Sequence, residues 1–151
     1  MEVPDYINDL KHLLAICNDG KEGYRKAAEH AESPRLKELF TNYSEQRERF
    51  AGDIRTVIEG MGDTYDNQKG GPMGAAFRVW MDLLSALTAK DNYAMLNSCI
   101  TGEVSALNDY DKVLARTAYE PQVRDMLRQQ RIEMGKALEN LEKLARVYRN
   151  T

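Results

Sequence analysis

The residues of this 151-residue sequence best placed for chemistry are a few polar side chains that interrupt apolar helical patterns. Glu103 lies seven residues after Leu96 and seven before Tyr110, so helical spacing puts it on an apolar face. A buried carboxylate without a partner is costly, so Glu103 must be neutral, paired or metal-bound. The same spacing turns four further polar residues toward the interior, the last of them less consistently: Gln46, Arg47, Gln130 and Glu133.

These residues allow two interpretations. In the first, Arg47 pairs with Glu103, while Gln46 and Gln130 complete the hydrogen bonds of a polar core that fixes helix register. In the second, Glu103 and Glu133 are weak candidates for metal ligands. A carboxylate-bridged dimetal centre takes a Glu from each of two helices and a Glu-x-x-His from each of two others. The inward positions supply no His and include a cation, so the sequence favours the polar core, with no cofactor, no metal and no catalytic residue.

The remaining reactive residue types fit structural roles better. His12 and His30 are 18 residues apart, off the apolar stripe, and are predicted to be solvated. Cys17 and Cys99 behave as small core residues, and the tyrosines on the stripes read as core packing. No Gly-rich phosphate loop, Cys-x-x-Cys pair or Ser/His/Asp set is present.

Four segments place these residues, because each shows apolar side chains at helical spacing. They cover about 5–31, 34–60, 91–117 and 121–149. Ser33 and Asp91 are predicted N-caps of the second and third segments. Each segment is near 27 residues, or about 40 Å at 1.5 Å per residue. Four matched helices with one apolar stripe each predict an antiparallel four-helix bundle.

The connections predict the topology. The first two helices are joined within a few residues, as are the last two, so each pair is a hairpin. About 30 residues separate the hairpins and include a short amphipathic helix near 73–88. A connection of that length can run along the bundle and leave the second and third helices parallel, which is the ferritin-like topology. The predicted fold is therefore all-α, a single domain over 1–151, with a long crossover.

Four glycines interrupt the predicted helices at about 1 kcal/mol each relative to Ala. They are Gly23, Gly52, Gly102 and Gly135. All four fall off the predicted core stripe, so we expect them to face outward. Glycines on an outer face let another helix approach closely, and the expected neighbour is the short helix around Trp80 or a second subunit.

Composition excludes several classes of protein. With 24 acidic and 21 basic residues and a net charge of −3, the chain shows no basic face or tail for nucleic acid. No apolar run approaches the ~20 residues that cross a bilayer, and Met1–Asp5 lacks a signal-peptide pattern. Two cysteines are too few for a disulfide framework. We therefore expect a cytoplasmic protein that binds neither nucleic acid nor membrane.

Several local motifs carry a resemblance. They are the stretch NDGKEGYRKAAE over 18–29, Leu39-Phe40, Gln46-Arg47-x-x-Phe50, Trp80-Met81-Asp82-Leu83, and Gly102-Glu103 with Tyr110 seven residues on. Together they resemble a bacterial family of functionally uncharacterised ferritin-like four-helix-bundle proteins, over about residues 5–148. The resemblance implies a ferritin-like fold and a bacterial cytosolic setting, and no established activity.

The wider ferritin superfamily resembles the chain in shape only. Its usual metal-ligand positions fall near Cys17, Ser44, Arg47, Arg131 and Met134, and only Glu103 is retained. The resemblance therefore implies a degenerate dimetal site. We expect a non-catalytic bundle that acts through self-association as a homodimer or through a partner, with a stress-related role suggested by the superfamily. The alternatives are a carboxylate-ligated iron or manganese protein and a module that binds a small anionic ligand at the Arg47 layer.

Overall fold

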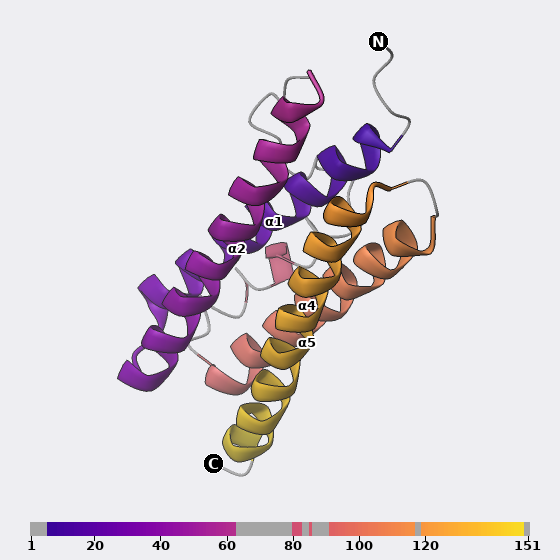
Figure 1. Ribbon diagram of the computed structural model, residues 1–151. Helices are drawn as coiled ribbons and strands as arrows, with labels where there is room; N and C mark the ends of the chain where they lie inside the picture. Colours follow the sequence, from indigo (N-terminus) through magenta and orange to yellow (C-terminus); the bar gives the residue numbers. More distant parts are fainter. Residues whose placement is uncertain (1–5, 63–79, 83–84, 86–90, 117–118, 150–151) are drawn as a thin grey trace.

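The computed structural model describes residues 6–62, 80–82, 85, 91–116 and 119–149, and these residues form helices and turns without a β-strand. The long helices are α1 (Ile7–His30), α2 (Pro34–Gly60), α4 (Asn92–Ala115) and α5 (Pro121–Arg149) (Figure 1). The all-α prediction is confirmed, and each predicted helix agrees within two residues at either end. The short helix expected near 73–88 lies mostly outside the described residues, although Trp80–Asp82 are helical.

The start of α2 follows from local chemistry. Pro34 occupies the first turn, where its missing N–H costs nothing. The Ser33 hydroxyl accepts a hydrogen bond from the Leu36 amide at 3.3 Å. Asp91 caps α4 in the same way, because its Oδ1 accepts from the Ala94 amide at 3.1 Å. Both predicted caps are present.

Removing the cap of α2 should destabilise the bundle. We expect Ser33→Ala to lower the free energy of unfolding by about 1 kcal/mol, because the Leu36 amide loses its acceptor. Urea denaturation followed by circular dichroism measures the change. Ser33→Asp keeps an acceptor and should stay close to the wild type; an equal loss in both variants would contradict the capping role.

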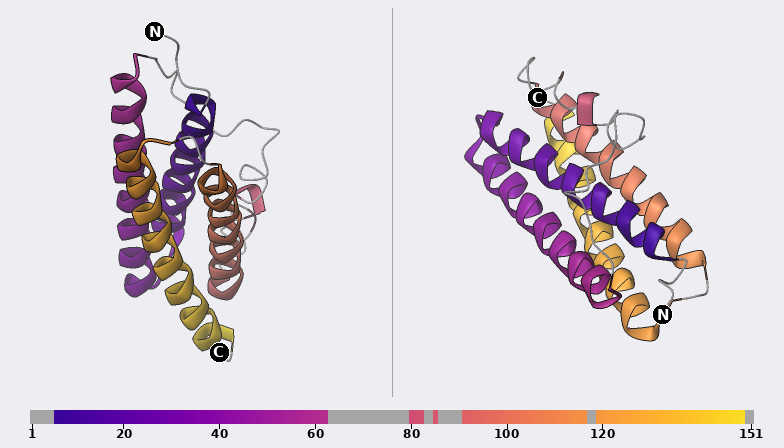
Figure 2. Two further views of the ribbon diagram at one scale, coloured as in Figure 1. Left: turned by 45° about the vertical axis from the view of Figure 1, so that its right-hand side comes forward. Right: turned by 90° about the horizontal axis from the view of Figure 1, so that it is seen from above.

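The four helices lie side by side in two hairpins, α1–α2 and α4–α5 (Figures 1 and 2). α2 and α4 run in the same direction, so the end of α2 and the start of α4 lie at opposite ends of the bundle (Figure 1). α1 also lies against α4, and α2 against α5, whereas α2 and α4 are diagonal to one another. α5 is inclined to α2 and diverges from it toward the C-terminus (Figure 2, left).

The apolar core is divided into two clusters. One gathers Leu10, Leu13, Leu14, Phe50, Ile54, Ile58, Tyr110, Leu127 and Met134, among others. The other gathers Tyr24, Leu36, Phe40, Leu96, Cys99, Leu141 and Leu144, among others. The buried polar residues of the described chain are Arg47, Glu103 and Gln130. No helix among the described residues meets the length and hydropathy needed to span a membrane.

The glycine prediction is only partly right. Gly23 and Gly102 are buried, which contradicts the expected outward position. A Cβ on Gly23 would overlap the Trp80 ring, so this glycine does receive the Trp80 segment. Gly52 and Gly135 are partly exposed, and a Cβ there would meet only an arginine side chain of the same helix, at 3.9 and 3.8 Å. At Gly23 the error arose because a stripe drawn for four helices takes no account of the Trp80 side chain that lies on the outer side of α1.

Candidate functional site

An ion pair crosses the centre of the bundle. Arg47 on α2 donates through Nη2 to Oε1 of Glu103 on α4, and both side chains are 1% exposed. Because α2 and α4 are diagonal neighbours, the pair spans the core itself and not a surface seam. A buried pair of this kind attracts strongly at low dielectric but has also lost the hydration of two charges.

Tyr24 of α1 forms a hydrogen bond with the same carboxylate oxygen. Its hydroxyl donates to Glu103 Oε1, so that atom accepts from both Tyr24 and Arg47. The Arg47 guanidinium carbon lies 5.7 Å from the centre of the Tyr24 ring, a cation–π contact. The second oxygen, Oε2, is buried and accepts no hydrogen bond from the described residues. The negative charge of the site is therefore neutralised from one side.

Gly20 gives the arginine its room. A Cβ at Gly20 would lie 3.1 Å from Arg47 Nη1 and 3.4 Å from Cγ, tighter than ordinary van der Waals contact. Glycine in a helix costs up to about 1 kcal/mol relative to Ala. At this position, the missing side chain lets the guanidinium reach across to Glu103.

A second chain of hydrogen bonds lies in the other half of the core. Cys17 Sγ lies 3.4 Å from the Tyr110 hydroxyl, which donates to Gln130 Oε1 at 2.7 Å. Gln130 Nε2 donates to the Phe50 carbonyl at 3.4 Å. The predicted inward position of Gln130 agrees with its 2% exposure, but its partner is Tyr110 and not Arg47. This chain links α1, α4, α5 and α2.

Burial controls the ionisation of these groups. It raises the pKa of the Tyr24 and Tyr110 hydroxyls well above their ordinary value, with Glu103 adding to the shift at Tyr24 and Cys17 at Tyr110. It also raises the pKa of the Cys17 thiol to about 11. At Arg47, burial is the largest single influence and opposes the charge, but Glu103, Tyr24, Cys17 and Tyr110 together outweigh it and raise the pKa. The layer at neutral pH therefore holds a charged arginine, neutral phenols and an unreactive thiol.

Two tyrosines belong to the site although the sequence pattern assigned them to packing. Tyr24 and Tyr110 are buried in the core as predicted, and in addition their hydroxyls make the hydrogen bonds just described. A usable signal was their position: both lie on the same stripes and near the same level as the inward polar residues. A buried Tyr hydroxyl generally has a partner.

Glu133 does not join the layer. Its side chain is 32% exposed and lies 4.0 Å from Arg49, so the expectation of an inward carboxylate was wrong. It lines a shallow groove between α2 and α5, together with Tyr43, Gln46 and others. Gln46 is only half-buried, and its Oε1 accepts weakly from Arg47 Nε at 3.5 Å.

The other candidate ligands also lie apart. His12 and His30 are exposed; His12 faces Asp109 at 3.8 Å, and His30 Nδ1 lies 2.9 Å from the Lys26 carbonyl. No group of three His, Cys, Asp or Glu residues suited to a metal ion occurs among the described residues. Cys17 and Cys99 are both buried and free.

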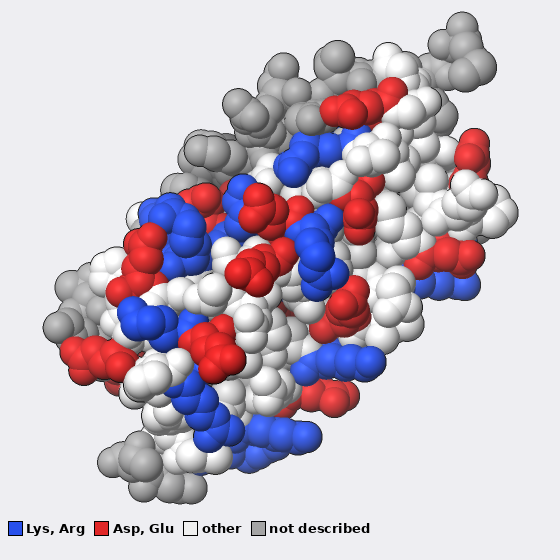
Figure 3. All heavy atoms as spheres, turned by 60° about the vertical axis from the view of Figure 1, so that its left-hand side comes forward, with Lys and Arg blue, Asp and Glu red and all other residues white. Residues whose placement is uncertain are grey.

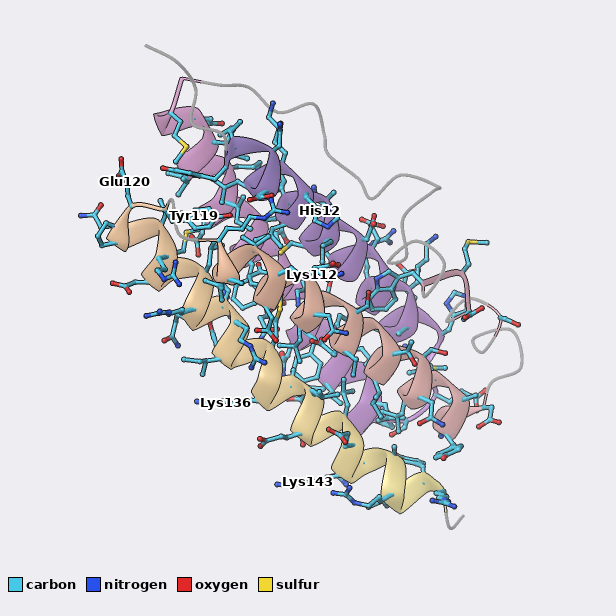
Figure 4. All side chains as sticks on the ribbon, turned by 90° about the vertical axis from the view of Figure 1, so that its right-hand side faces the viewer. His12, Lys112, Tyr119, Glu120, Lys136 and Lys143 are labelled. Atoms are coloured by element: carbon cyan, nitrogen blue, oxygen red, sulfur yellow. The ribbon has the colours of Figure 1, made fainter. Side chains whose placement is uncertain are left out.

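The surface carries charges of both signs. On the face shown in Figure 3, Lys and Arg alternate with Asp and Glu, and neither sign forms a continuous patch. Lys136 and Lys143 extend from α5 away from the other helices (Figure 4). This face lacks the single-sign patch that typically marks a nucleic-acid site.

Comparison with known proteins gives one family. Residues 5–116, about three quarters of the chain, match the family described as Domain of unknown function (DUF2383). The chain belongs to this family. No curated protein matches the chain. The part of this DUF2383 chain that matches contains α1, α2 and α4, and therefore includes Tyr24, Arg47 and Glu103.

Proposed function

We propose that this DUF2383 chain is a ferritin-like bundle in which a buried ion pair has replaced the dimetal site. In this proposal the chain is non-catalytic and acts by self-association as a homodimer or by binding a partner. Two hairpins joined by a long crossover, with parallel second and third helices, support the ferritin-like part. The bacterial and cytoplasmic setting and a stress-related role are proposed from the resemblance alone.

The observation that carries the proposal is the position of Arg47. Its guanidinium binds Glu103, the one carboxylate residue that is buried among the described residues, and Gly20 leaves the space that it fills. The other polar groups of the layer are two phenols, a thiol and an amide, a donor set that lacks the carboxylates and histidines of a dimetal centre. A second cation beside Glu103 would be repelled by the first. The residues do not fit a dimetal centre.

The two alternatives have less support. A metal site built from Glu103 and Glu133 would need both carboxylates in one cluster, but Glu133 is partly exposed and pairs with Arg49. An anionic ligand at the Arg47 layer would have to compete with Glu103 for a fully buried guanidinium. Neither alternative has an observation that favours it.

Metal analysis and solution mass test the proposal together. We expect protein incubated with iron, manganese and zinc and then desalted to retain well under one metal ion per chain by mass spectrometry. Sedimentation analysis should show a mass that rises with protein concentration, or a stable dimer. The control is Glu133→Gln, which should change neither result.

Two results would overturn the proposal. Near-stoichiometric metal that is lost in Glu103→Gln but kept in Glu133→Gln would restore a metal centre at the core. A strictly monomeric chain with no protein partner captured by crosslinking in its native host would remove the assembly role.

A further inference from the structure

The outer side of α1 holds an aromatic ring in a fitted slot. The Trp80 side chain lies on Gly23, where a Cβ would overlap three of its ring atoms. The same ring meets Tyr24 edge-on, with the ring centres 5.4 Å apart and the planes at 68°. The edge-to-face arrangement is one that aromatic rings prefer, because the positive edge of one ring meets the negative face of the other. The slot is therefore shaped for a planar aromatic group.

The walls of the slot belong to the bundle, whereas its occupant belongs to the connection. Gly23 and Tyr24 are buried within α1. The Tyr24 ring also packs against the rings of Phe40 and Tyr43, with ring centres 6.2 and 5.4 Å apart. Trp80 itself is only partly buried, and its neighbours Met81 and Asp82 are exposed. The slot can therefore keep its shape without the ring that fills it.

We propose that the Gly23–Tyr24 slot is a binding site for a planar aromatic ring of the indole class, with Trp80 as its intramolecular ligand. This inference rests on the binding role proposed above, and it specifies where that binding takes place and which ligand chemistry it involves. A second ring and Trp80 exclude one another, so a ligand must displace Trp80. The apparent affinity is then the intrinsic affinity reduced by the fraction of chains whose slot is open.

The ring could come from a free aromatic molecule or from Trp80 of a second copy. The chain between Gly62 and Trp80 is long enough to reach about 60 Å when extended, which exceeds the length of the bundle. Exchange between copies would leave every slot filled, as in other swapped dimers. Both sources present the same indole ring to the same slot.

Free indole and an emptied slot provide the first test. We expect Trp80→Ala to melt at a lower temperature than the wild type by scanning calorimetry, with indole restoring part of the loss in a saturable way. At ten times its dissociation constant, indole should raise the melting temperature by about 3–6 °C. The wild type should respond far less, because Trp80 already fills its slot.

A matched pair of variants shows where indole binds. Trp80→Ala with Gly23→Val fills the slot with a side chain and should abolish the indole response. Trp80→Ala with Gly52→Val carries the same substitution at a glycine whose Cβ would meet only Arg55, at 3.9 Å, and should keep the response. Equal responses in both double variants, or no response in Trp80→Ala, would overturn the proposal.

A mixing experiment distinguishes the two sources of the ring and does not depend on the melting of Trp80→Ala. Trp80 is the single tryptophan of the chain, so Gly23→Val is fluorescent and Trp80→Ala is not. Gly23→Val alone should emit at longer wavelength than the wild type, since its ring is expelled; an unchanged spectrum would overturn the slot itself. If a second copy supplies the ring, adding Trp80→Ala will shift that emission back toward shorter wavelength and increase the mass. No such shift would assign the slot to free aromatic ligands.

These results are separable from those of the proposed function. Indole binding can fail while the chain still forms a dimer without metal, which would leave the assembly role and remove only the slot. A monomeric chain that binds indole would leave the slot and remove the assembly role.

Discussion

Replacing Arg47 with Ala should lower the free energy of unfolding by about 3–5 kcal/mol, the largest single-site effect that we expect. The substitution leaves Glu103, which is 1% exposed, without its cation in the middle of the core. It also leaves a cavity where the largest fully buried side chain stood. Denaturation with urea at neutral pH, fitted with a fixed m-value, measures the loss.

Two further variants distinguish the loss of the buried cation from the general effect of substituting an arginine in α2. Arg49→Ala removes an exposed arginine from the same helix, and should cost no more than about 0.5 kcal/mol. The triple variant Tyr24→Phe, Arg47→Met, Glu103→Leu replaces the whole cluster with apolar groups and should recover most of the loss, since no polar atom of the cluster stays unpaired. A cost below about 1 kcal/mol for Arg47→Ala would contradict the role of the buried pair in holding the core together.

Alkaline pH should unfold this protein steeply, because its buried thiols and phenols ionise more easily in the unfolded chain. The folded pKa of Cys17 is raised from 9.0 to about 11, and those of Cys99, Tyr24 and Tyr110 are raised too. A group with a raised folded pKa contributes its stability below the unfolded pKa and loses it as pH rises. The loss therefore begins near pH 9 with the thiols and steepens above pH 10 with the tyrosines.

The slope reports the number of groups involved. Each group that is ionised only in the unfolded state contributes about 1.4 kcal/mol per pH unit, so Cys17, which is partly ionised at both ends of the range, accounts for about 2 kcal/mol between pH 9 and 11. Urea denaturation at half-unit steps from pH 8 to 11 measures the curve. Cys17→Ala should reduce the slope between pH 9 and 11 by about one proton, whereas Lys136→Gln, on the exposed face of α5, should not. A flat curve up to pH 10.5 would contradict the assignment.

Much of the candidate site could be predicted from spacing alone. Glu103, Arg47 and Gln130 were placed inward because an α-helix repeats every 3.6 residues, and all three are buried in the described chain. The same method failed at Glu133 and at Gly23, which lie near the edge of a stripe. At such an edge, the presence or absence of a neighbouring element decides whether a residue is buried or exposed, and the spacing does not reveal that element. It also treated Tyr24 and Tyr110 as apolar, because periodicity records hydrophobic rings and not where a hydroxyl will find its acceptor.

The sequence by itself determined the all-α class, the bounds of four helices, two caps and the presence of a polar layer. These are local properties, set by turn residues and by the period of apolar side chains within one segment. Only the tertiary structure decided that Arg47 reaches diagonally to Glu103, that Gln130 turns to Tyr110, and that Trp80 lies on Gly23. Each of those contacts joins residues far apart in the chain, and so depends on how helices are rotated and stacked, which no single segment encodes.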